Sequence, residues 1–225
     1  MLRKVPFVTV EGVDGAGKSS QLPVILKKLQ QAGFDVVQTR EPGGTPLGEL
    51  LREQILNGQH EMNPNTQALL AFASRSEHVE QVIRPALDQG KAVLSDRFTD
   101  STFAYQVGGG GASKPLVEAL EREVQQGLQP DITFIFDLPV EESFARMHRE
   151  ARNLDNFESK PKQYFEQVRK GFLDRKKANP ARVVIIDASV SKYEVSSQVE
   201  AALDDFLQRW ALREGTSPNQ KRPSP

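Results

Sequence analysis

The sequence of 225 residues has no cysteine, no excess of either charge and no long hydrophobic run. The absence of cysteine excludes disulfides and thiolate metal sites. Because 29 basic residues stand against 30 acidic ones, the net charge of -1 gives the molecule no overall attraction for nucleic acid or for an anionic membrane. The first apolar run, VPFVTV, ends at Glu11 and is too short for a signal sequence or a membrane span. We therefore expect a cytoplasmic protein that binds neither nucleic acid nor membrane.

What the sequence does contain is a repeated alternation of short β-branched or aromatic runs with longer stretches of helical pattern. We predict strands at 5–11, 35–39, 91–95, 131–137 and 182–187, and helices at 19–32, 47–56, 66–89 and 113–126. Gly33, Gly90 and Gly127 directly follow three of these helices, where glycine is common. This alternation predicts an α/β fold in which helices cover both faces of a five-stranded parallel sheet.

Three segments lie outside this pattern: the glycine run 108–111, the charged segment 146–161 and the Pro/Ser-rich end 214–225. We predict one domain over 1–213, because a chain of this length with 38% hydrophobic residues can bury one core. The end 214–225 is predicted to be a disordered tail. The three histidines, His60, His78 and His148, are scattered and are predicted to be surface or packed residues.

The stretch EGVDGAGKSS, residues 11–20, lies between the first predicted strand and the first predicted helix. Within it, Gly12, Gly17, Lys18 and Ser19 match the pattern G-x-x-x-x-G-K-[ST]. In such a loop the backbone N–H groups face phosphate oxygens, the lysine reaches the β and γ oxygens, and the hydroxyl can hold Mg²⁺. We predict that a nucleoside triphosphate contacts Gly12, Val13, Asp14, Gly15, Ala16, Gly17, Lys18, Ser19 and Ser20.

A second cluster of charged residues follows the next two strands. Arg40 and Glu41 end the predicted strand 35–39, and Asp96 and Arg97 follow the strand 91–95. The carboxyl ends of parallel strands meet at one edge of the sheet, which is the usual ligand crevice. Asp96 has the position of a carboxylate that orients Mg²⁺, while Arg40 and Arg97, with Arg75 from the long helix, have the geometry to hold one phosphate.

Two phosphate sites on one crevice indicate a kinase whose acceptor already carries a phosphate. A GTPase would need a guanine-reading N-K-x-D segment, which does not occur in the sequence. The near-neutral charge does not support a helicase. A phosphate acceptor is already a nucleophile, so alignment and charge neutralisation suffice for catalysis and no general base is required.

The motifs GVDGAGKSSQ, TREPGGTPLGELLR, LLAFASRSEHV, SDRFTDSTFAYQ and LDNFES occur in the order and at the spacing found in bacterial thymidylate kinases. The resemblance covers roughly residues 6–189. It implies a three-layer P-loop kinase fold, transfer of the ATP γ-phosphoryl group to dTMP with formation of dTDP and ADP, Mg²⁺ bound with Ser19 and Asp96, and a homodimer. ATP and dTMP are the partners that it implies.

The resemblance also implies roles for individual residues. Contacts with dTMP are expected from Asp14, Arg40, Glu41, Phe72, Arg75, Arg97, Thr102, Tyr105 and Gln106. Among these, Arg40 and Arg97 would hold the phosphate, Arg75 would contact the thymine edge, and Tyr105 would exclude a ribose 2'-hydroxyl. A lid at 146–161 would supply arginines, so the catalytic set is Lys18, Asp14, Arg97, Asp96, Arg149 and Arg152.

Three positions depart from the family pattern. Gly110 and Asn156 stand where arginine is usual, and Ala71 stands where a phenylalanine commonly stacks on thymine, so the adjacent Phe72 is our candidate for that stacking. Two alternatives follow. Instead of a dTMP kinase, the chain would be either a kinase for another deoxynucleotide or a nucleoside, or a nucleotide-binding homologue with weakened catalysis. Only an unphosphorylated acceptor would need a carboxylate base, and Glu41 has the position of one.

Overall fold

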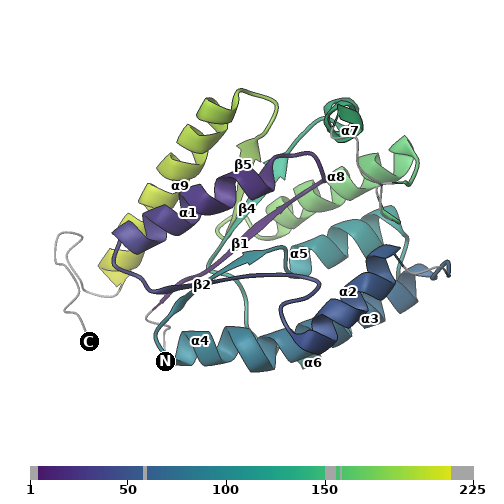
Figure 1. Ribbon diagram of the computed structural model, residues 1–225, viewed down its shortest axis with the longest axis horizontal. Helices are drawn as coiled ribbons and strands as arrows, with labels where there is room; N and C mark the ends of the chain where they lie inside the picture. Colours follow the sequence, from purple (N-terminus) through teal and green to yellow (C-terminus); the bar gives the residue numbers. More distant parts are fainter. Residues whose placement is uncertain (1–4, 58–59, 150–155, 158, 214–225) are drawn as a thin grey trace.

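The computed structural model describes residues 5–57, 60–149, 156–157 and 159–213. Its centre is a parallel sheet with the strand order β2-β3-β1-β4-β5 (Figure 1). The strands are β1 (Phe7–Gly12), β2 (Val36–Arg40), β3 (Ala92–Asp96), β4 (Ile132–Asp137) and β5 (Val183–Asp187). Each observed strand overlaps a predicted one, and the predicted α/β fold with a five-stranded parallel sheet is confirmed.

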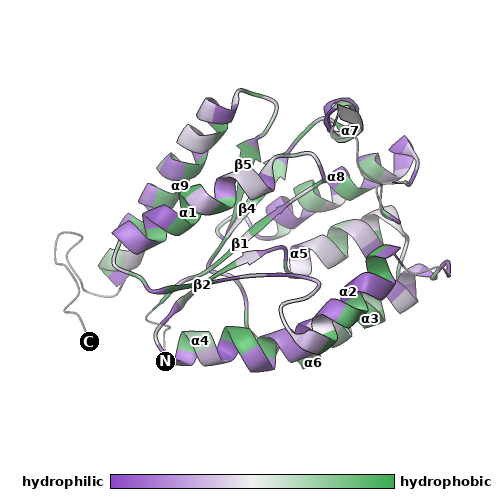
Figure 2. Ribbon diagram, in the orientation of Figure 1, coloured by the Kyte–Doolittle hydropathy of each residue, from purple (hydrophilic) through white to green (hydrophobic). Residues whose placement is uncertain are grey.

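Strand β1 is the middle strand of the sheet, and all of its residues are buried. Its register pairs Val10 with Asp96 of β3 on one side and with Phe134 of β4 on the other. Strands buried on both faces are expected to be continuously apolar, and the strands of the sheet are accordingly mostly hydrophobic in Figure 2. The chain leaves β1 for β2 at the edge and returns to β3 between them, so the β1 and β3 carboxyl ends flank one crevice.

Helices cover both faces of the sheet (Figure 1). On one face, α1 (Lys18–Gln31) lies beside α9 (Lys192–Arg213). The other face is covered by α4 (Arg84–Asp88), α5 (Thr99–Thr102) and α8 (Lys162–Ala178). Helices α2 (Pro46–Asn57), α3 (Pro64–His78) and α6 (Lys114–Gln125) pack outside this layer, and α7 (Val140–Arg149) follows β4. In the described part of the chain, no helix combines the length and the apolar character needed to cross a membrane.

The predicted single helix 66–89 is divided in the structure. Helix α3 ends at His78, a π-helical segment spans Val79–Ile83, and α4 begins at Arg84. Pro85 explains the division, because it lacks an N–H group and its ring clashes with the preceding turn of a regular α-helix. The wider π turn keeps the helix axis continuous past the proline.

The glycine run also has a structural role that the sequence pattern did not reveal. A second π-helical segment, Phe103–Gly109, continues α5 and packs against α8. A Cβ atom on Gly109 would lie 2.6 Å from the Tyr164 ring, and one on Gly108 would lie 3.0 Å from the Gln167 carbonyl oxygen. Glycine therefore lets two helices approach closely beneath the crevice.

Helices α7, α8 and α9 were absent from the predicted elements. The segment 146–161 was treated as irregular, but its first four residues belong to α7, which is strongly amphipathic. The remainder of the predicted lid is described only in part, and the predicted tail 214–225 lies outside the described residues.

Candidate active site

The phosphate-binding loop joins β1 to α1 as predicted. Gly12 has a φ of 136°, and a Cβ atom there would lie 2.5 Å from the Phe136 carbonyl oxygen, so no larger residue fits. The Lys18 ammonium folds back over the loop and donates to the carbonyl oxygens of Gly12 at 3.0 Å and Val13 at 2.9 Å. Burial, and then the nearby Arg97 guanidinium, lower the pKa of Lys18. This cation is held where a phosphate would lie.

A first cavity, the phosphate-loop cavity, is lined by residues 14–20 of the loop and by Asp96. Of the predicted contacts, Gly12 and Val13 are not among the described residues that line it, and their carbonyl oxygens accept from Lys18. Within the described residues, the buried Asp96 Oδ1 has no hydrogen-bond partner. A buried carboxylate oxygen without a partner is costly unless a ligand satisfies it, and an oxygen ligand of this kind suits Mg²⁺.

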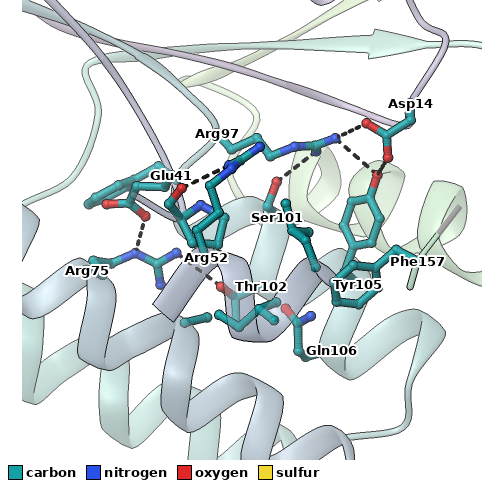
Figure 3. A pocket seen from close by; sticks show the side chains of 15 residues that line it. Asp14, Glu41, Arg52, Arg75, Arg97, Ser101, Thr102, Tyr105, Gln106 and Phe157 are labelled. Carbon is teal, nitrogen blue, oxygen red and sulfur yellow. Dashed lines mark hydrogen bonds and ion pairs between the residues drawn. The ribbon is translucent and has the colours of Figure 1, made fainter. Parts of the chain in front are cut away.

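The turn after β3 places an arginine between the loop and a second cavity. Arg97 has a φ of 69°, in the left-handed region that bulky residues seldom adopt. Its Nη1 donates to the Gly12 carbonyl at 2.8 Å and to Ser101 Oγ at 3.1 Å. Its Nη2 donates to Asp14 Oδ1 at 2.7 Å and to the Tyr105 hydroxyl at 3.2 Å (Figure 3). The strained backbone thus directs the guanidinium toward the phosphate loop.

Asp14 is the negative partner at this junction. Its burial alone would raise the pKa of the carboxyl, but Arg97 and Lys18 outweigh that effect and bring the pKa to about 2. The Tyr105 hydroxyl donates to Asp14 Oδ2 at 3.0 Å. Ser143 of α7 donates to the Asp14 carbonyl at 2.7 Å, which fixes the loop from its other side. Asp14 is therefore ionised and held at neutral pH.

The second cavity, the guanidinium-lined cavity, encloses about 670 Å³ with its open mouth included. It is lined at its polar end by Asp14, Glu41, Arg52, Arg75 and Arg97. The phosphate-loop cavity is also lined by Asp14, Arg52 and Arg97, so the two cavities share these three side chains. The structure thus has two adjoining cavities where the sequence predicts two phosphate sites.

A buried polar chain orients Arg75 in the wall of the guanidinium-lined cavity. Arg75 Nε donates to Glu41 Oε2 at 2.8 Å, and Nη2 donates to Thr102 Oγ1 at 3.1 Å. The other Glu41 oxygen lies 2.8 Å from His78 Nδ1, and His78 Nε2 lies 2.6 Å from Thr39 Oγ1. His78 is fully buried, so of the two environments predicted for the histidines it has the packed one. Arg75 Nη1 has no partner among the described residues and is available to a ligand.

The apolar end of the same cavity differs from the prediction at one residue. Ala71, Tyr105 and Phe157 line the cavity, and the Tyr105 and Phe157 rings meet edge to face at 5.7 Å. Phe72 is not among the described lining residues: it is buried under Arg75, whose Cζ lies 4.4 Å from the ring centre. Ala71 and Arg75 are four residues apart on α3 and share the cavity face, whereas Phe72 faces the helices behind. The predicted residues Thr102 and Gln106 do line the cavity.

Two arginines also differ from the prediction in whether they line a cavity. The Arg40 side chain is 55% exposed, pairs with Glu49 at 2.9 Å and is not among the described residues that line either cavity. Arg52 of α2 lines both cavities instead and donates to the Pro42 carbonyl at 2.9 Å. The sequence could have indicated that Arg52 faces inward, because it shares a helix face with the buried Gly48 and Ile55.

Of the three lid arginines, only Arg146 has a described side chain. It lines the phosphate-loop cavity and donates to the Ala188 carbonyl at 2.9 Å. Arg152 and the side chain of Arg149, both in the predicted catalytic set, lie outside the described residues.

The two positions that lack the expected arginine have different surroundings. A Cβ atom on Gly110 would lie 2.9 Å from the Gln106 carbonyl oxygen and 3.1 Å from Pro64 Cβ, so an arginine there requires the backbone to move. Asn156 donates its backbone N–H to the Leu56 carbonyl at 2.8 Å, which joins this segment to the end of α2. Crowding thus explains the glycine, and nothing in the structure explains the asparagine.

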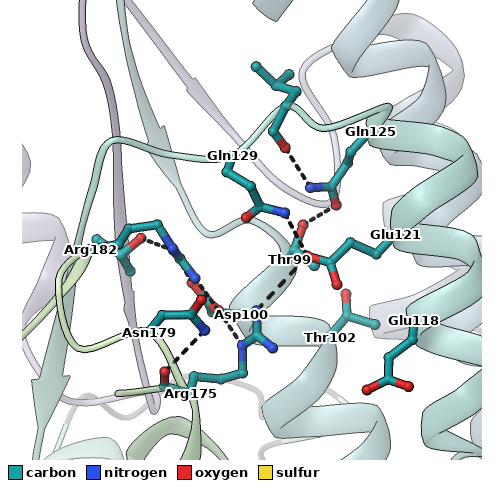
Figure 4. Close-up of polar contacts among 12 residues, drawn as sticks. Thr99, Asp100, Thr102, Glu118, Glu121, Gln125, Gln129, Arg175, Asn179 and Arg182 are labelled. Atoms are coloured by element: carbon teal, nitrogen blue, oxygen red, sulfur yellow. Dashed lines mark hydrogen bonds and ion pairs between the residues drawn. The ribbon is translucent and has the colours of Figure 1, made fainter. Parts of the chain in front are cut away.

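A second group of buried charges lies next to this site and resembles it in chemistry (Figure 4). Asp100 of α5 accepts from Arg175 Nε at 2.6 Å and from Arg182 Nη1 and Nη2 at 2.7 and 3.0 Å. Arg182 also donates to Thr133 Oγ1 at 2.6 Å, and Arg175 lies over the Phe103 ring. None of these residues lines either cavity, so the Asp100 cluster is structural.

The fold and the site together define the class of the protein. A phosphate loop after β1 opens on one cavity, and the β3 turn carries a guanidinium into the next, which is the layout of a P-loop kinase with an anionic acceptor. Comparison with known proteins agrees, since the family model for thymidylate kinase matches residues 10–199. The chain belongs to the thymidylate kinase family.

Individual relatives are similar over nearly the whole chain. A thymidylate kinase of Pseudomonas fluorescens (strain Pf0-1) is 49% identical over 203 residues, which cover 90% of this chain and 96% of that protein. One of Neisseria gonorrhoeae (strain NCCP11945) is 47% identical over 201 residues, or 89% and 97% of the two chains. The crystal structure of thymidylate kinase from Ehrlichia chaffeensis matches with a TM-score of 0.71 at 33% identity, over 88% of this chain and 98% of that one.

Proposed function

We propose that this chain transfers the γ-phosphoryl group of ATP to the phosphate of dTMP and so forms dTDP and ADP. The observation that carries the proposal is the pair of adjoining cavities, one at the phosphate loop and one lined by guanidinium groups, with Asp14, Arg52 and Arg97 common to both. A phosphate bound in each cavity would meet the other at these three residues. The names of the relatives supply dTMP as the acceptor.

In this proposal ATP lies in the phosphate-loop cavity. Residues 14–20 surround its phosphates, Lys18 neutralises the β and γ oxygens, and Arg146 contacts the nucleotide from α7. Arg149 and Arg152 keep the catalytic role that the family resemblance implies. Lys18 is already desolvated and fixed by two carbonyls, so little reorganisation is required when phosphate replaces them.

The residues present also fit the magnesium ion that such a reaction requires. Ser19 and Asp96 line the phosphate-loop cavity, and the unpartnered Asp96 Oδ1 is the expected ligand, directly or through water. When bound, Mg²⁺ supplies additional positive charge to the phosphates. No cluster of three His, Asp or Glu side chains suited to a metal occurs in the described residues, which agrees with an ion held mainly by the nucleotide.

The acceptor dTMP lies in the guanidinium-lined cavity. Arg97 and Arg52 hold its phosphate, Arg52 taking the place predicted for Arg40. Arg75, held by Glu41 and Thr102, offers its free Nη1 to the base. The thymine ring lies at the apolar end with Gln106, Tyr105 and Phe157, and the Tyr105 ring restricts space beside the sugar.

The chemistry then needs alignment more than proton transfer. The acceptor phosphate is a dianion near neutral pH and attacks without a general base, so the side chains have to bring two anions into line and neutralise them. Glu41 is engaged by Arg75 and His78 and serves as a structural anchor, not as a base. This argues against the alternative of an unphosphorylated nucleoside as acceptor.

We further propose a homodimer formed through α2 and α3. These helices pack on each other at the outside of the molecule, and Leu47, Leu50 and Leu69 are 47%, 67% and 47% exposed on them. Such a surface is favourably covered by a second copy. Leu50→Glu is expected to shift the protein to monomers in sedimentation, whereas Leu212→Glu on the distant α9 leaves its mass unchanged; a monomeric wild type contradicts the proposal.

A coupled assay of ADP release tests the function. ATP with dTMP, dUMP, other deoxynucleoside monophosphates and thymidine is expected to show turnover that is greatest with dTMP. Comparable turnover of thymidine and dTMP would overturn the acceptor assignment. Tight binding of ATP and dTMP without dTDP would instead identify a homologue that has lost catalysis.

A further inference from the structure

Glu11 is a buried acidic residue that the proposed mechanism does not use. It is the penultimate residue of the central strand β1, is 0% exposed, and lies in a position where an apolar residue would be expected. Its side chain does not line either cavity. A buried carboxyl group requires hydrogen-bond partners, and those of Glu11 lie in the segment directly after Arg97.

Glu11 accepts three hydrogen bonds from this segment. Phe98 donates its backbone N–H to Oε1 at 2.7 Å, and Ser101 donates its N–H to Oε1 at 3.3 Å and its hydroxyl to Oε2 at 2.5 Å. Phe98 is the N-cap of α5 and makes no side-chain capping bond itself. The Glu11 carboxyl on β1 therefore supplies the capping hydrogen-bond acceptor that the N-cap residue of α5 does not provide.

The same contacts control the arginine that both cavities share. The left-handed backbone at Arg97 persists only if its surroundings hold it. On one side the Arg97 N–H donates to the Val10 carbonyl at 2.8 Å, and on the other side Glu11 holds the following N–H, that of Phe98. Ser101 Oγ, which Glu11 orients, also accepts from Arg97 Nη1 at 3.1 Å. Glu11 thus fixes the backbone after Arg97 and, through Ser101, the guanidinium itself.

We propose that Glu11 is a positioning residue for phosphoryl transfer, which acts through the Phe98 N–H and the Ser101 hydroxyl to hold the Arg97 guanidinium between the two cavities. The inference rests on the proposed function, because it assumes that Arg97 contacts the acceptor phosphate. It predicts that the hydrogen bonds of the Glu11 side chain matter for catalysis, whereas its negative charge does not.

The charge state of Glu11 agrees with that prediction. Burial, and then the neighbouring Asp100 carboxylate, raise its pKa to about 8, against the opposing effect of Arg97. Lys18 of α1 also lies close enough to interact with the Glu11 charge. When the carboxyl is protonated, Oε1 still accepts from Phe98 while Oε2–H donates to Ser101 Oγ. Glutamine reproduces this state, since its carbonyl accepts and its NH₂ group donates.

The experiment compares wild type with Glu11→Gln and Glu11→Met at pH 7, with dTMP and ATP varied separately. Glu11→Gln is expected to keep kcat/KM for dTMP within about 3-fold, whereas Glu11→Met, similar in size but unable to accept, lowers it about 10- to 100-fold. The KM for ATP should change much less than the KM for dTMP in both variants. Thr9→Val, which removes the 2.7 Å contact with Thr133 from the same buried strand, is the control for loss of stability alone and should leave both constants unchanged.

The results separate the positioning role of Glu11 from the proposed function. A folded Glu11→Met enzyme with wild-type kcat/KM for dTMP overturns the positioning role, as does an equal loss toward both substrates or a Glu11→Gln enzyme as impaired as Glu11→Met. If Glu11→Met does not fold, Glu11→Asp, whose carboxyl is one methylene too short to reach Phe98, should show the same selective loss. A wild-type protein that does not phosphorylate dTMP refutes the proposed function instead.

Discussion

The Asp100 cluster and the Asp14–Arg97 pair both join a carboxylate to guanidinium groups, and they differ in whether they face a cavity. At Asp100, both carboxylate oxygens are filled by Arg175 and Arg182, and the group is closed off from both cavities. At Asp14, the partner Arg97 lines both cavities and holds four acceptors at the edge of open space. The same chemistry is therefore enclosed within the fold at Asp100 and faces two cavities at Asp14.

The comparison shows that burial of an ion pair does not by itself indicate function. Both carboxylates have pKa values lowered against burial by neighbouring arginines. The two carboxylates differ in whether their arginine partners line a cavity. Substitutions at the Asp14 site should therefore change the kinetic constants, and substitutions in the Asp100 cluster should change the free energy of unfolding. The following predictions test that separation in order of expected effect.

The largest effect is expected at the phosphate loop. Lys18→Ala removes the cation that neutralises the transferred phosphoryl group and should lower kcat by about 10³-fold or more in the coupled ADP assay. Because the loop faces a cavity, the urea unfolding midpoint of the Lys18→Ala variant should remain close to that of the wild-type protein. A rate within tenfold of wild type would show that this loop is not the donor site.

Asp100→Ala is expected to have the largest effect on stability. It removes the carboxylate that Arg175 and Arg182 share and leaves these arginines their polar contacts with Glu121 at 3.9 Å and Thr133 Oγ1 at 2.6 Å, respectively. The free energy of unfolding should fall by about 3 kcal/mol, measured by urea denaturation. The turnover per folded molecule should change little. Arg209→Ala, which removes an exposed pair with Asp205 on α9, is the control and should cost less than about 1 kcal/mol. A stable Asp100→Ala protein would contradict the structural role of the cluster.

Matched arginine-to-lysine changes sharpen the comparison. Arg97→Lys keeps the charge but loses the planar fork, so KM for dTMP should rise about 10- to 100-fold with a much smaller change for ATP. Arg175→Lys makes the same change in the Asp100 cluster and should lower the melting temperature while both KM values stay near wild type. An equal rise in both KM values for Arg97→Lys would refute the assignment of Arg97 to the acceptor phosphate.

The smallest effect concerns pH. The folded-state pKa of Glu11, about 8, lies above the ordinary 4.5, so the folded chain binds more protons than the unfolded chain between these values. Its contribution to stability is complete below about pH 4.5 and is lost as pH rises through about 8. Between pH 5 and 9, wild type should therefore lose about 1–3 kcal/mol relative to Glu11→Gln in urea denaturation. A constant difference across that range would contradict the raised pKa.

The sheet and the phosphate loop could be predicted because their signals are local. Each strand is a short β-branched or aromatic run, and the loop is a contiguous motif at a strand-to-helix junction. The rule that the carboxyl ends of parallel strands meet at one edge of the sheet was enough to predict Asp96 and Arg97 near the loop, and the observed strand order places β3 beside β1.

Where the predicted cavity residues were wrong, the residue type was right but the face of the strand or helix on which it lies was not. Alternation along the edge strand β2 places Thr39 inward toward His78 and Arg40 outward toward Glu49, which the period of two would have indicated. On α3 a step of one residue is a rotation of about 100°, so Ala71 and not Phe72 shares the cavity face with Arg75. The contribution of Phe157 comes from a segment without periodicity, and no local signal predicts it.

The left-handed turn at Arg97 lay beyond sequence reasoning for another reason. A positive φ is normally indicated by glycine or asparagine, and here the conformation is imposed by contacts from Val10 and Glu11, which are distant in the sequence.

Because Asp14, Arg52 and Arg97 line both cavities, ATP and dTMP bound as proposed would share contacts, and their binding is expected to be coupled. A phosphate that replaced Asp14 as an acceptor for Arg97 Nη2 would change the charge distribution beside the other cavity. By thermodynamic linkage, whatever factor ATP imposes on the affinity for dTMP, dTMP imposes on the affinity for ATP. Through the shared side chains, the binding of each substrate would therefore change the affinity of the enzyme for the other.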